Sequence, residues 1–309
     1  MKYLAVRITC QLLSDASFSA YKGSMLRGTL GSHLRRAVCM TQKNDCTQCL
    51  LGRTCIFPRL FTAASAPQGS GTAPLLPPPF CIVPTTDKKT LYEKGEFFSF
   101  TLKLFSYAVE YLPYFIHALT LAGQRGMGKG SEHGAGMFSI EEVRHGDDQL
   151  YDAHNEHLVP CTGQELEIPV LGEDMGTASL ACHFITPLRF KAANHLSSEL
   201  DFSTLFRLIL RRIKSLSALE GQSYRLPDDM FSTIFQCADS TRVEENSLRW
   251  EDWSRYSGRQ QAVMQFGGLT GRIVYRGPVR SFADYLDFAH HVHIGKQTSF
   301  GLGQCEFVL

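Results

Sequence analysis

Four cysteines near the N-terminus have the residue type and the spacing of metal ligands. They follow the pattern Cys39-x6-Cys46-x2-Cys49-x5-Cys55. The central C-x2-C pair supplies two thiolates from one tight turn, and the flanking cysteines complete a tetrahedral set of four ligands for zinc. Because such a closed set leaves no position for a catalytic water, we expect a structural ion that holds a polar loop in place. Free, partly buried thiols and an iron–sulfur cluster are the alternatives.

Two loops of the chain have the same spacing of glycines. Each position of the second loop lies 167 residues after its counterpart in the first, as position 293 does after position 126. The first loop has Gly126, Gly128, Gly134 and Gly136, and the second has His293, Gly295, Gly301 and Gly303. Closely spaced glycines let backbone N–H groups approach a bulky anion, so the loops are candidate binding sites for a phosphate backbone. A tight turn is the alternative. A dinucleotide fingerprint is excluded because each loop follows a helix and precedes a strand.

The elements around these loops repeat as well. The first half predicts strands over 2–13, 97–105 and 137–143 and helices over 24–39 and 105–121. The second half predicts strands over 179–190 and 305–309, a hairpin over 262–275, and helices over 201–219 and 282–292. This β-α-β-β-α-β order is ferredoxin-like. We therefore expect an α+β protein of two tandem ferredoxin-like (RRM-like) halves, each with a glycine-rich loop.

The predicted domains follow from this repeat. Residues 1–143 form the N-terminal half, into which the cysteine cluster (39–55) and a loop rich in Pro and Gly (62–79) are inserted. Residues 144–177 are predicted to be an acidic linker. Residues 178–309 form the C-terminal half, which ends in the second glycine-rich loop.

Composition narrows the class of protein. The 309 residues are 44% hydrophobic and 20% charged, which excludes a wholly disordered or fibrous chain. The alternating first residues carry Arg7 and lack the apolar core of a signal peptide. No apolar run approaches the roughly 20 residues that span a bilayer. We therefore expect a cytoplasmic protein with reduced thiols and no membrane partner.

Charge is strongly segregated although the net charge is only +1. Residues 1–60 carry nine basic side chains against two acidic ones, a net charge of +7. Residues 141–175 carry ten acidic side chains against one basic one, a net charge of −9. Such segregation favours a basic surface for a polyanion, and chance clustering on solvated faces is the alternative.

The glycine loop, the first predicted helix and the cysteine cluster resemble those of a known group of proteins. The C-terminal glycine loop, preceded by a helix and followed by the last strand, resembles the RAMP superfamily of CRISPR-associated proteins. The run Leu26-Arg27-Gly28-Thr29-Leu30-Gly31, the run Leu34-Arg35-Arg36, the four cysteines and residues 57–61 resemble one branch of its CRISPR repeat-processing endoribonucleases. His293 departs from the family pattern, which has glycine in that slot.

The resemblance implies cleavage of the repeat in precursor CRISPR RNA without a catalytic metal. The partners it implies are repeat RNA, mature CRISPR RNA and other subunits of an effector complex. Metal-free cleavage uses the RNA's own 2′-hydroxyl as nucleophile and leaves a 2′,3′-cyclic phosphate and a 5′-hydroxyl. It requires a general base, a general acid and cations that stabilise the phosphorane.

Family enzymes usually keep a histidine in or beside the first helix, often with a tyrosine or lysine nearby. His33 is the sole histidine among the first hundred residues. We assign His33 as general acid/base, Tyr21 as an orienting or proton-transfer partner, and Lys22 or Arg27 as the stabilising charge. A histidine that contacts only phosphate is the alternative reading. Rival histidines are His117, His290, His291 and His293.

Basic side chains outside this group are predicted to bind RNA. In the helix over 201–219, Arg207, Arg211 and Lys214 share one face and Arg212 lies at its edge. The same pattern is typical of a solvated surface helix. Aromatic and basic residues alternate over 249–256, where base stacking and core packing are both plausible. The remaining predicted RNA contacts outside the glycines are Arg35, Arg36 and Lys296.

Three functions are compatible with these patterns. The first is an endoribonuclease that retains its stem-loop product. The second is a non-catalytic subunit that binds CRISPR RNA while another enzyme cuts. The third is a zinc-containing interaction module, which the repeated glycine frames disfavour. A histidine in the first helix favours the endoribonuclease.

Overall fold

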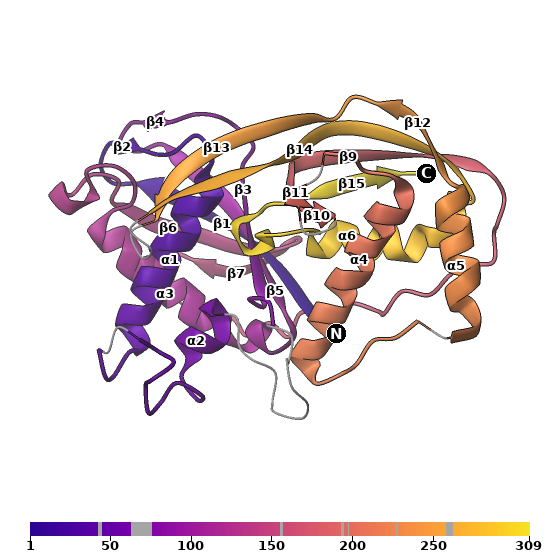
Figure 1. Cartoon of the computed structure of the whole chain (residues 1–309). Helices are drawn as coiled ribbons and strands as arrows, with labels where there is room; N and C mark the ends of the chain where they lie inside the picture. Colours follow the sequence, from indigo (N-terminus) through magenta and orange to yellow (C-terminus); the bar gives the residue numbers. More distant parts are fainter. Residues whose placement is uncertain are drawn as a thin grey trace. The chain divides into compact units, whose positions relative to one another are not determined.

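The computed structural model of the chain (Figure 1) describes residues 1–42, 45–62, 76–154, 157–192, 195–196, 198–226, 228–257 and 262–309. These residues divide into two compact units. Unit 1 comprises Met1–Leu166 and Ser215–Gln222, and unit 2 comprises Glu167–Lys214 and Ser223–Leu309. Among the described helices, none has the length and apolar character needed to cross a membrane.

Unit 1 is built on an antiparallel sheet with β1 (Lys2–Leu12) at its centre. Strands β5 (Phe97–Phe105) and β6 (Phe138–His145) flank β1. The edges are β3 (Phe80–Pro84), which pairs with β5, and β7 (Asp148–Asp152), which pairs with β6. Alternate side chains of β1 are buried, because one face of the sheet meets the core. The short strands are β2 (Ala16–Ser17), β4 (Leu91–Tyr92) and β8 (Gln164–Glu165).

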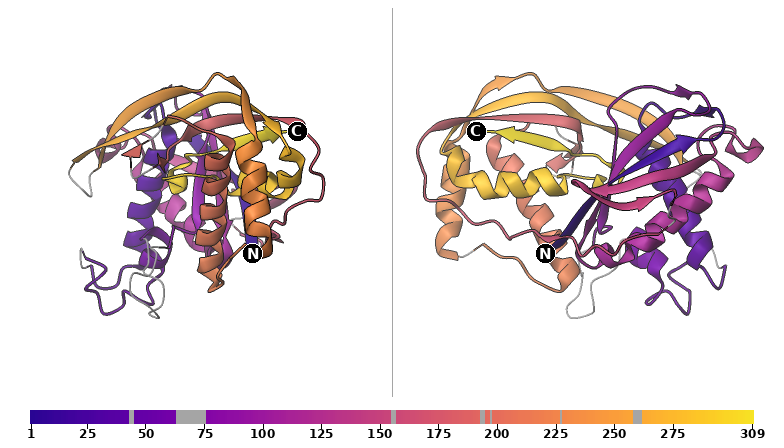
Figure 2. Two further views of the ribbon diagram at one scale, coloured as in Figure 1. Left: turned by 45° about the vertical axis from the view of Figure 1, so that its right-hand side comes forward. Right: turned by 180° about the vertical axis from the view of Figure 1, so that it is seen from behind.

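Two helices cover that face of the sheet (Figure 2). Helix α1 (Lys22–Val38) packs against α3 (Leu112–Arg125) and β3, and α3 packs against β6. The short α2 (Ile56–Phe61) packs against α1, and a 3-10 turn over Ser106–Tyr111 leads into α3. The order β1-α1-β3-β5-α3-β6, with the sheet order β3-β5-β1-β6, is ferredoxin-like.

Unit 2 repeats this plan. Its sheet has the order β12-β14-β9-β15, with β13 also paired to β14. Helices α4, α5 and α6 lie on one side of it (Figure 1). The strands are β9 (Ala178–Leu188), β10 (Lys191–Ala192), β11 (His195–Leu196), β12 (Arg242–Asn246), β13 (Arg249–Ser257), β14 (Ala262–Gly277) and β15 (Cys305–Val308). The helices are α4 (Phe202–Ser217), α5 (Asp228–Ser240) and α6 (Ala283–Val292). The predicted fold class is confirmed.

One element of the second half was predicted wrongly. Residues 262–275 are a single strand within β14, not a hairpin, and β14 pairs with β9, β12 and β13. The glycines of β14 serve close backbone approach. A Cβ at Gly268 would lie 2.5 Å from the carbonyl oxygen of Leu188, and one at Gly271, where φ is +109°, would lie 2.7 Å from that of Ser247.

The predicted acidic linker over 144–177 also differs from the structure. Strands β7 and β8 fall inside it, and its residues up to Leu166 belong to unit 1. Acidic side chains concealed the strands because β7 lies at the edge of the sheet, where polar residues are tolerated. Of the predicted Pro- and Gly-rich loop over 62–79, residues 63–75 lie outside the described residues.

Candidate functional site

His33 lies on α1 and is held in a defined orientation. Its Nδ1 lies 2.9 Å from the carbonyl oxygen of Thr29, so a neutral ring carries its proton on Nδ1 and donates it to that carbonyl. The side chain is 7% exposed, and among the described residues its Nε2 is buried with no hydrogen-bond partner. The free lone pair therefore sits on Nε2, the atom that a general base needs.

The surroundings of His33 keep its ring neutral. Burial lowers its pKa, the hydrogen bond to Thr29 works in the opposite direction, and the positive charges of Arg36 and Arg125 lower the pKa further. Arg36 lies on α1, whereas Arg125 is the last residue of α3 and directly precedes the first glycine loop. The packing of α1 on α3 thus lets a charge more than 90 residues away in the sequence act on His33. Sequence reasoning missed Arg125, whose signal is its place beside the glycine frame.

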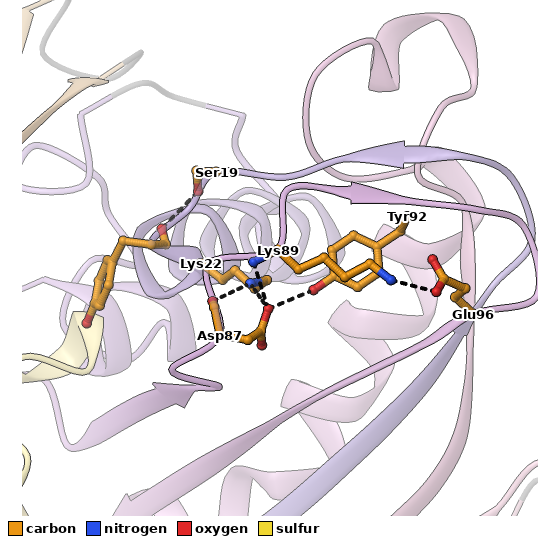
Figure 3. Close-up of polar contacts among 7 residues, drawn as sticks. Ser19, Lys22, Asp87, Lys89, Tyr92 and Glu96 are labelled. Atoms are coloured by element: carbon orange, nitrogen blue, oxygen red, sulfur yellow. Dashed lines mark hydrogen bonds and ion pairs between the residues drawn. The ribbon is translucent and has the colours of Figure 1, made fainter.

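Lys22, predicted to stabilise charge, is instead committed to an internal ion pair (Figure 3). Its side chain is 3% exposed, and its Nζ lies 2.8 Å from Oδ1 of Asp87 and 3.0 Å from the carbonyl oxygen of the same residue. The Tyr92 hydroxyl also donates to Asp87, at 3.4 Å. Burial works to raise the pKa of Asp87, but hydrogen bonds from Lys22 and Thr85 and the Lys22 charge bring it to about 2.

The predicted catalytic quartet does not form one cluster on α1. Lys22 and His33 are eleven residues apart, which corresponds to about 16 Å along a helix axis. Tyr21 precedes α1, and burial raises the pKa of its phenol. The Arg27 guanidinium donates to the carbonyl oxygen of Phe61 at 3.3 Å and lies 5.4 Å from the centre of the Phe61 ring. These contacts give Arg27 a role in packing.

The two glycine loops have the same backbone conformation. Five positions in each loop have positive φ, and each pair is displaced by 167 residues. In the first loop φ is 87°, 96°, 80°, 83° and 68° at residues 126, 128, 130, 134 and 136. In the second it is 58°, 87°, 62°, 88° and 73° at residues 293, 295, 297, 301 and 303. The bond from Met127 N–H to the Gly136 carbonyl (2.9 Å) recurs from Ile294 to Gly303 (3.0 Å). The internal repeat is confirmed.

Most glycines of these loops lie so close to a backbone carbonyl that a Cβ atom would clash with it. A Cβ at Gly136 would lie 2.0 Å from the carbonyl oxygen of Met127, and one at Gly303 would lie 1.8 Å from that of Ile294. The same holds at Gly126, Gly128 and Gly295, which face carbonyl oxygens at 2.2, 2.5 and 2.6 Å. At Gly134, in contrast, a Cβ meets nothing within 4 Å.

His293 occupies a glycine slot with φ 58° and ψ 149°, a conformation that side chains rarely adopt. Its ring is fully buried, and Nδ1 lies 3.2 Å from the carbonyl oxygen of Leu302. His293 therefore fills the interior of the second loop, while Lys296 of the same loop is exposed. Its ring packs inside the loop and is not presented to a substrate.

The basic face of α4 is present, but one predicted member is wrong. Arg207, Arg211 and Lys214 are exposed, as their spacing predicts. Arg212 is 5% exposed, and its Nε and Nη2 donate to the carbonyl oxygen of Val292 at 3.0 and 2.9 Å. Val292 ends α6 directly before the second glycine loop, so Arg212 caps that helix rather than facing RNA.

Comparisons with known proteins agree with this architecture. Residues 1–162 match the family model AF_1859_N, an N-terminal domain. Residues 182–305 match the model of the CRISPR-associated endoribonuclease Cas6. The chain belongs to the AF_1859_N family. An uncharacterized protein of Archaeoglobus fulgidus is 24% identical over 288 residues, which cover 92% of this chain and 90% of the relative.

Solved Cas6 structures share the fold of the whole chain. A Cas6 (TTHB231) product complex has a TM-score of 0.58 and 14% identity, and the match covers 99% of this chain and 100% of that one. Thermus thermophilus Cas6 (TTHB231) has a TM-score of 0.53 and 12% identity, with 99% and 98% covered. At these identities the likeness establishes the fold. It supports the predicted tandem ferredoxin-like architecture.

The candidate residues divide between the two matched regions. The AF_1859_N part contains His33, Arg36, Arg125 and the four cysteines. The region matched by the Cas6 model contains the basic face of α4 and the second glycine loop. The same region contains Trp253 of β13, whose ring stacks on that of Phe266, its partner on β14, with centroids 6.3 Å apart. Trp253 itself is half-buried, so this contact does not decide between core packing and base stacking over 249–256.

The four cysteines of the AF_1859_N part lie close together in space. Cys39, Cys46, Cys49 and Cys55 all line one small cavity beside the C-terminal end of α1. Arg35 lines the same cavity, and its guanidinium lies 5.9 Å from the centre of the Phe57 ring. Arg35 is therefore partly engaged in packing, whereas Arg36 is exposed.

Proposed function

We propose that the protein is a metal-independent endoribonuclease that cleaves the repeat of precursor CRISPR RNA and retains the stem-loop product. The Cas6 domain match and the tandem ferredoxin-like fold support RNA processing. The observation that best supports catalysis is the state of His33. Its imidazole donates from Nδ1 to Thr29 and leaves the Nε2 lone pair for a substrate proton. The charges of Arg36 and Arg125 lower its pKa.

The proposed reaction begins with the 2′-hydroxyl of the nucleotide before the scissile phosphate. His33 Nε2 takes the hydroxyl proton, and the 2′-oxygen attacks the phosphorus. The bond to the leaving 5′-oxygen breaks, that oxygen takes a proton from water, and a 2′,3′-cyclic phosphate forms. Arg36 and Arg125 stabilise the negative charge on the phosphorane. Because Nε2 is covered in this structure, bound RNA must displace the groups that cover it.

RNA binding is assigned to two basic surfaces, each within one unit. The exposed face of Arg207, Arg211 and Lys214 on α4 binds backbone phosphates of the stem-loop. Arg36 and Arg125 bind the phosphate near His33. Many backbone N–H groups of the two glycine loops donate to carbonyl oxygens of the protein itself. From these loops the exposed side chain of Lys296 is therefore assigned to the RNA. Subunits of a CRISPR effector complex are the proposed protein partners.

A non-catalytic CRISPR RNA-binding subunit is the second candidate. The observation that favours it is that Lys22 and Arg27 are engaged in contacts within unit 1. These two cations are therefore directed at protein groups. Under this alternative the protein binds the repeat stem-loop with the same basic surfaces and leaves the phosphodiester intact.

The two candidates are separated by incubating the protein with repeat RNA of its own locus in EDTA and analysing the products on a denaturing gel. A second RNA carries 2′-deoxyribose at the cleaved nucleotide. We expect one cut, a cyclic phosphate end, and no cut in the deoxy RNA. The metal content of the protein is measured in parallel, so that loss of a structural ion is recognised. Tight binding without cleavage would establish the binding subunit instead.

A further inference from the structure

The cysteine-lined cavity has features of a metal site rather than of a group of free thiols. Its four cysteines come from three places in the fold. Cys39 directly follows α1, and Cys55 directly precedes α2. Cys46 and Cys49 belong to the connection between these helices. A single ion bound by ligands from both ends and from the middle of this connection would hold the connection in one conformation.

The connection turns back on itself repeatedly. The N–H of Cys49 donates to the Cys46 carbonyl at 3.4 Å, that of Gly52 to the Cys49 carbonyl at 2.9 Å, and that of Cys55 to the Leu51 carbonyl at 2.8 Å. A Cβ at Gly52 would lie only 2.4 Å from the carbonyl oxygen of Cys46. This close approach requires glycine and brings the backbone around Cys46, Cys49 and Cys55 close together.

A hydrogen-bonding group lies beside one of the sulfurs. The Thr41 hydroxyl lies 3.3 Å from Cys49 Sγ. Gln42 has a φ of 52°, an unusual conformation for a residue other than glycine. Outer donors of this kind orient and stabilise thiolate ligands in metal sites.

Apolar packing is sparse among the described residues between α1 and α2. Of their large apolar side chains, Leu50 is 94% exposed, Met40 84% and Leu51 39%. A connection of this length without a core of its own requires another constraint. Four thiols around one cavity can supply it.

We propose that Cys39, Cys46, Cys49 and Cys55 bind one structural Zn²⁺ as four thiolates. Among the described residues, no three His, Cys, Asp or Glu side chains stand in a ligating arrangement as they are. Rotation of a cysteine between staggered χ1 rotamers moves its sulfur by about 3 Å, so binding requires reorientation of the thiols around the cavity. The ion with four thiolates carries two negative charges, which the adjacent Arg35 partly offsets.

The proposed ion ties the end of α1 to the start of α2, and this has a consequence for unit 1. Helix α2 carries Phe61, whose ring lies against Gly31 of α1, where a Cβ would be 2.9 Å from Phe61 Cε1. The same ring lies under Arg27, and Phe57 lies under Arg35. The ion thus fixes the aromatic surface on which two arginines of α1 rest.

The test is the metal content of the whole protein purified under reducing conditions, together with titration of the metal-free protein with Co²⁺. We expect one zinc per chain and, with Co²⁺, the thiolate charge-transfer absorption of a tetrahedral site at one equivalent. Cys46→Ser should lose the zinc, and the control Cys161→Ser, a partly buried cysteine of unit 1, should keep it.

The proposal is overturned if wild-type protein contains no stoichiometric zinc and Co²⁺ produces no charge-transfer band. Iron in anaerobically purified protein would replace zinc with an iron–sulfur cluster and equally contradict it. Because the Co²⁺ titration uses the wild-type chain, the result stands even if Cys46→Ser fails to fold. Neither readout depends on RNA cleavage, so it is independent of the proposed function.

Discussion

The capping role of Arg212 predicts that replacing it lowers stability without removing an RNA contact. In Arg212→Met, most of the buried hydrocarbon remains, but both donors to the Val292 carbonyl are lost. A hydrogen bond with a charged donor contributes about 1.5–3 kcal/mol, so we expect the free energy of unfolding to fall by about 2–3 kcal/mol. For a protein of 309 residues that corresponds to a decrease in Tm of roughly 3–5 °C.

Arg211→Met is the matched control, because the neighbouring side chain is exposed on the same helix. It should leave Tm unchanged and reduce the slope of log Kd against log salt by about 1 for repeat RNA. Thermal unfolding and RNA binding at several salt concentrations measure both variants. The reasoning is refuted if Arg212→Met melts like the wild type and loses RNA affinity as Arg211→Met does.

Further predictions concern the first half of the chain. Gly136→Ala should destabilise unit 1 far more than Gly134→Ala, because only at Gly136 would the added Cβ clash with a carbonyl oxygen. Gly134→Ala costs only the left-handed backbone conformation, about 1–2 kcal/mol. Equal decreases in the free energy of unfolding, measured by chemical denaturation, would contradict this. Lys22→Met should be less stable than the wild type at pH 7, and the difference should vanish as the pH falls from about 4 to 2, because the low pKa of Asp87 stabilises the fold only above that range; a pH-independent difference would exclude the ion pair as its cause. Arg125→Gln should move the acid limb of the cleavage profile to higher pH, because the Arg125 charge lowers the pKa of His33; an unmoved limb would separate Arg125 from the base.

The architecture was predictable because the chain contains an internal repeat. The glycine frames, displaced by 167 residues, indicated two related halves, and the paired φ values show that each frame reflects the same backbone conformation. The elements that were missed lack such a signal. Strand β3 is fully buried and short, and α5 interrupts the repeat in the second half only. Polar edge strands such as β7 resemble loops in composition.

Side-chain roles were less predictable than elements. Lys22 and His33 belong to one helix, but the rise of the helix separates them, and tertiary contacts such as Asp87 take up the charge. Arg212 and Arg211 are adjacent in the sequence, and only the position of α6 decides that one caps a carbonyl while the other meets solvent. The charge of Arg125 acts on the pKa of His33 because α1 packs on α3, and no local spacing in the sequence reveals that packing.

The central claim is that the Nε2 lone pair of His33 drives RNA cleavage. Single-turnover cleavage of repeat RNA by His33→Gln tests it most directly, with RNA affinity measured separately on the same samples. We predict a rate constant reduced by roughly 10²–10⁴-fold with unchanged affinity, the usual contribution of a general base. Cleavage by His33→Gln at the wild-type rate would contradict the account.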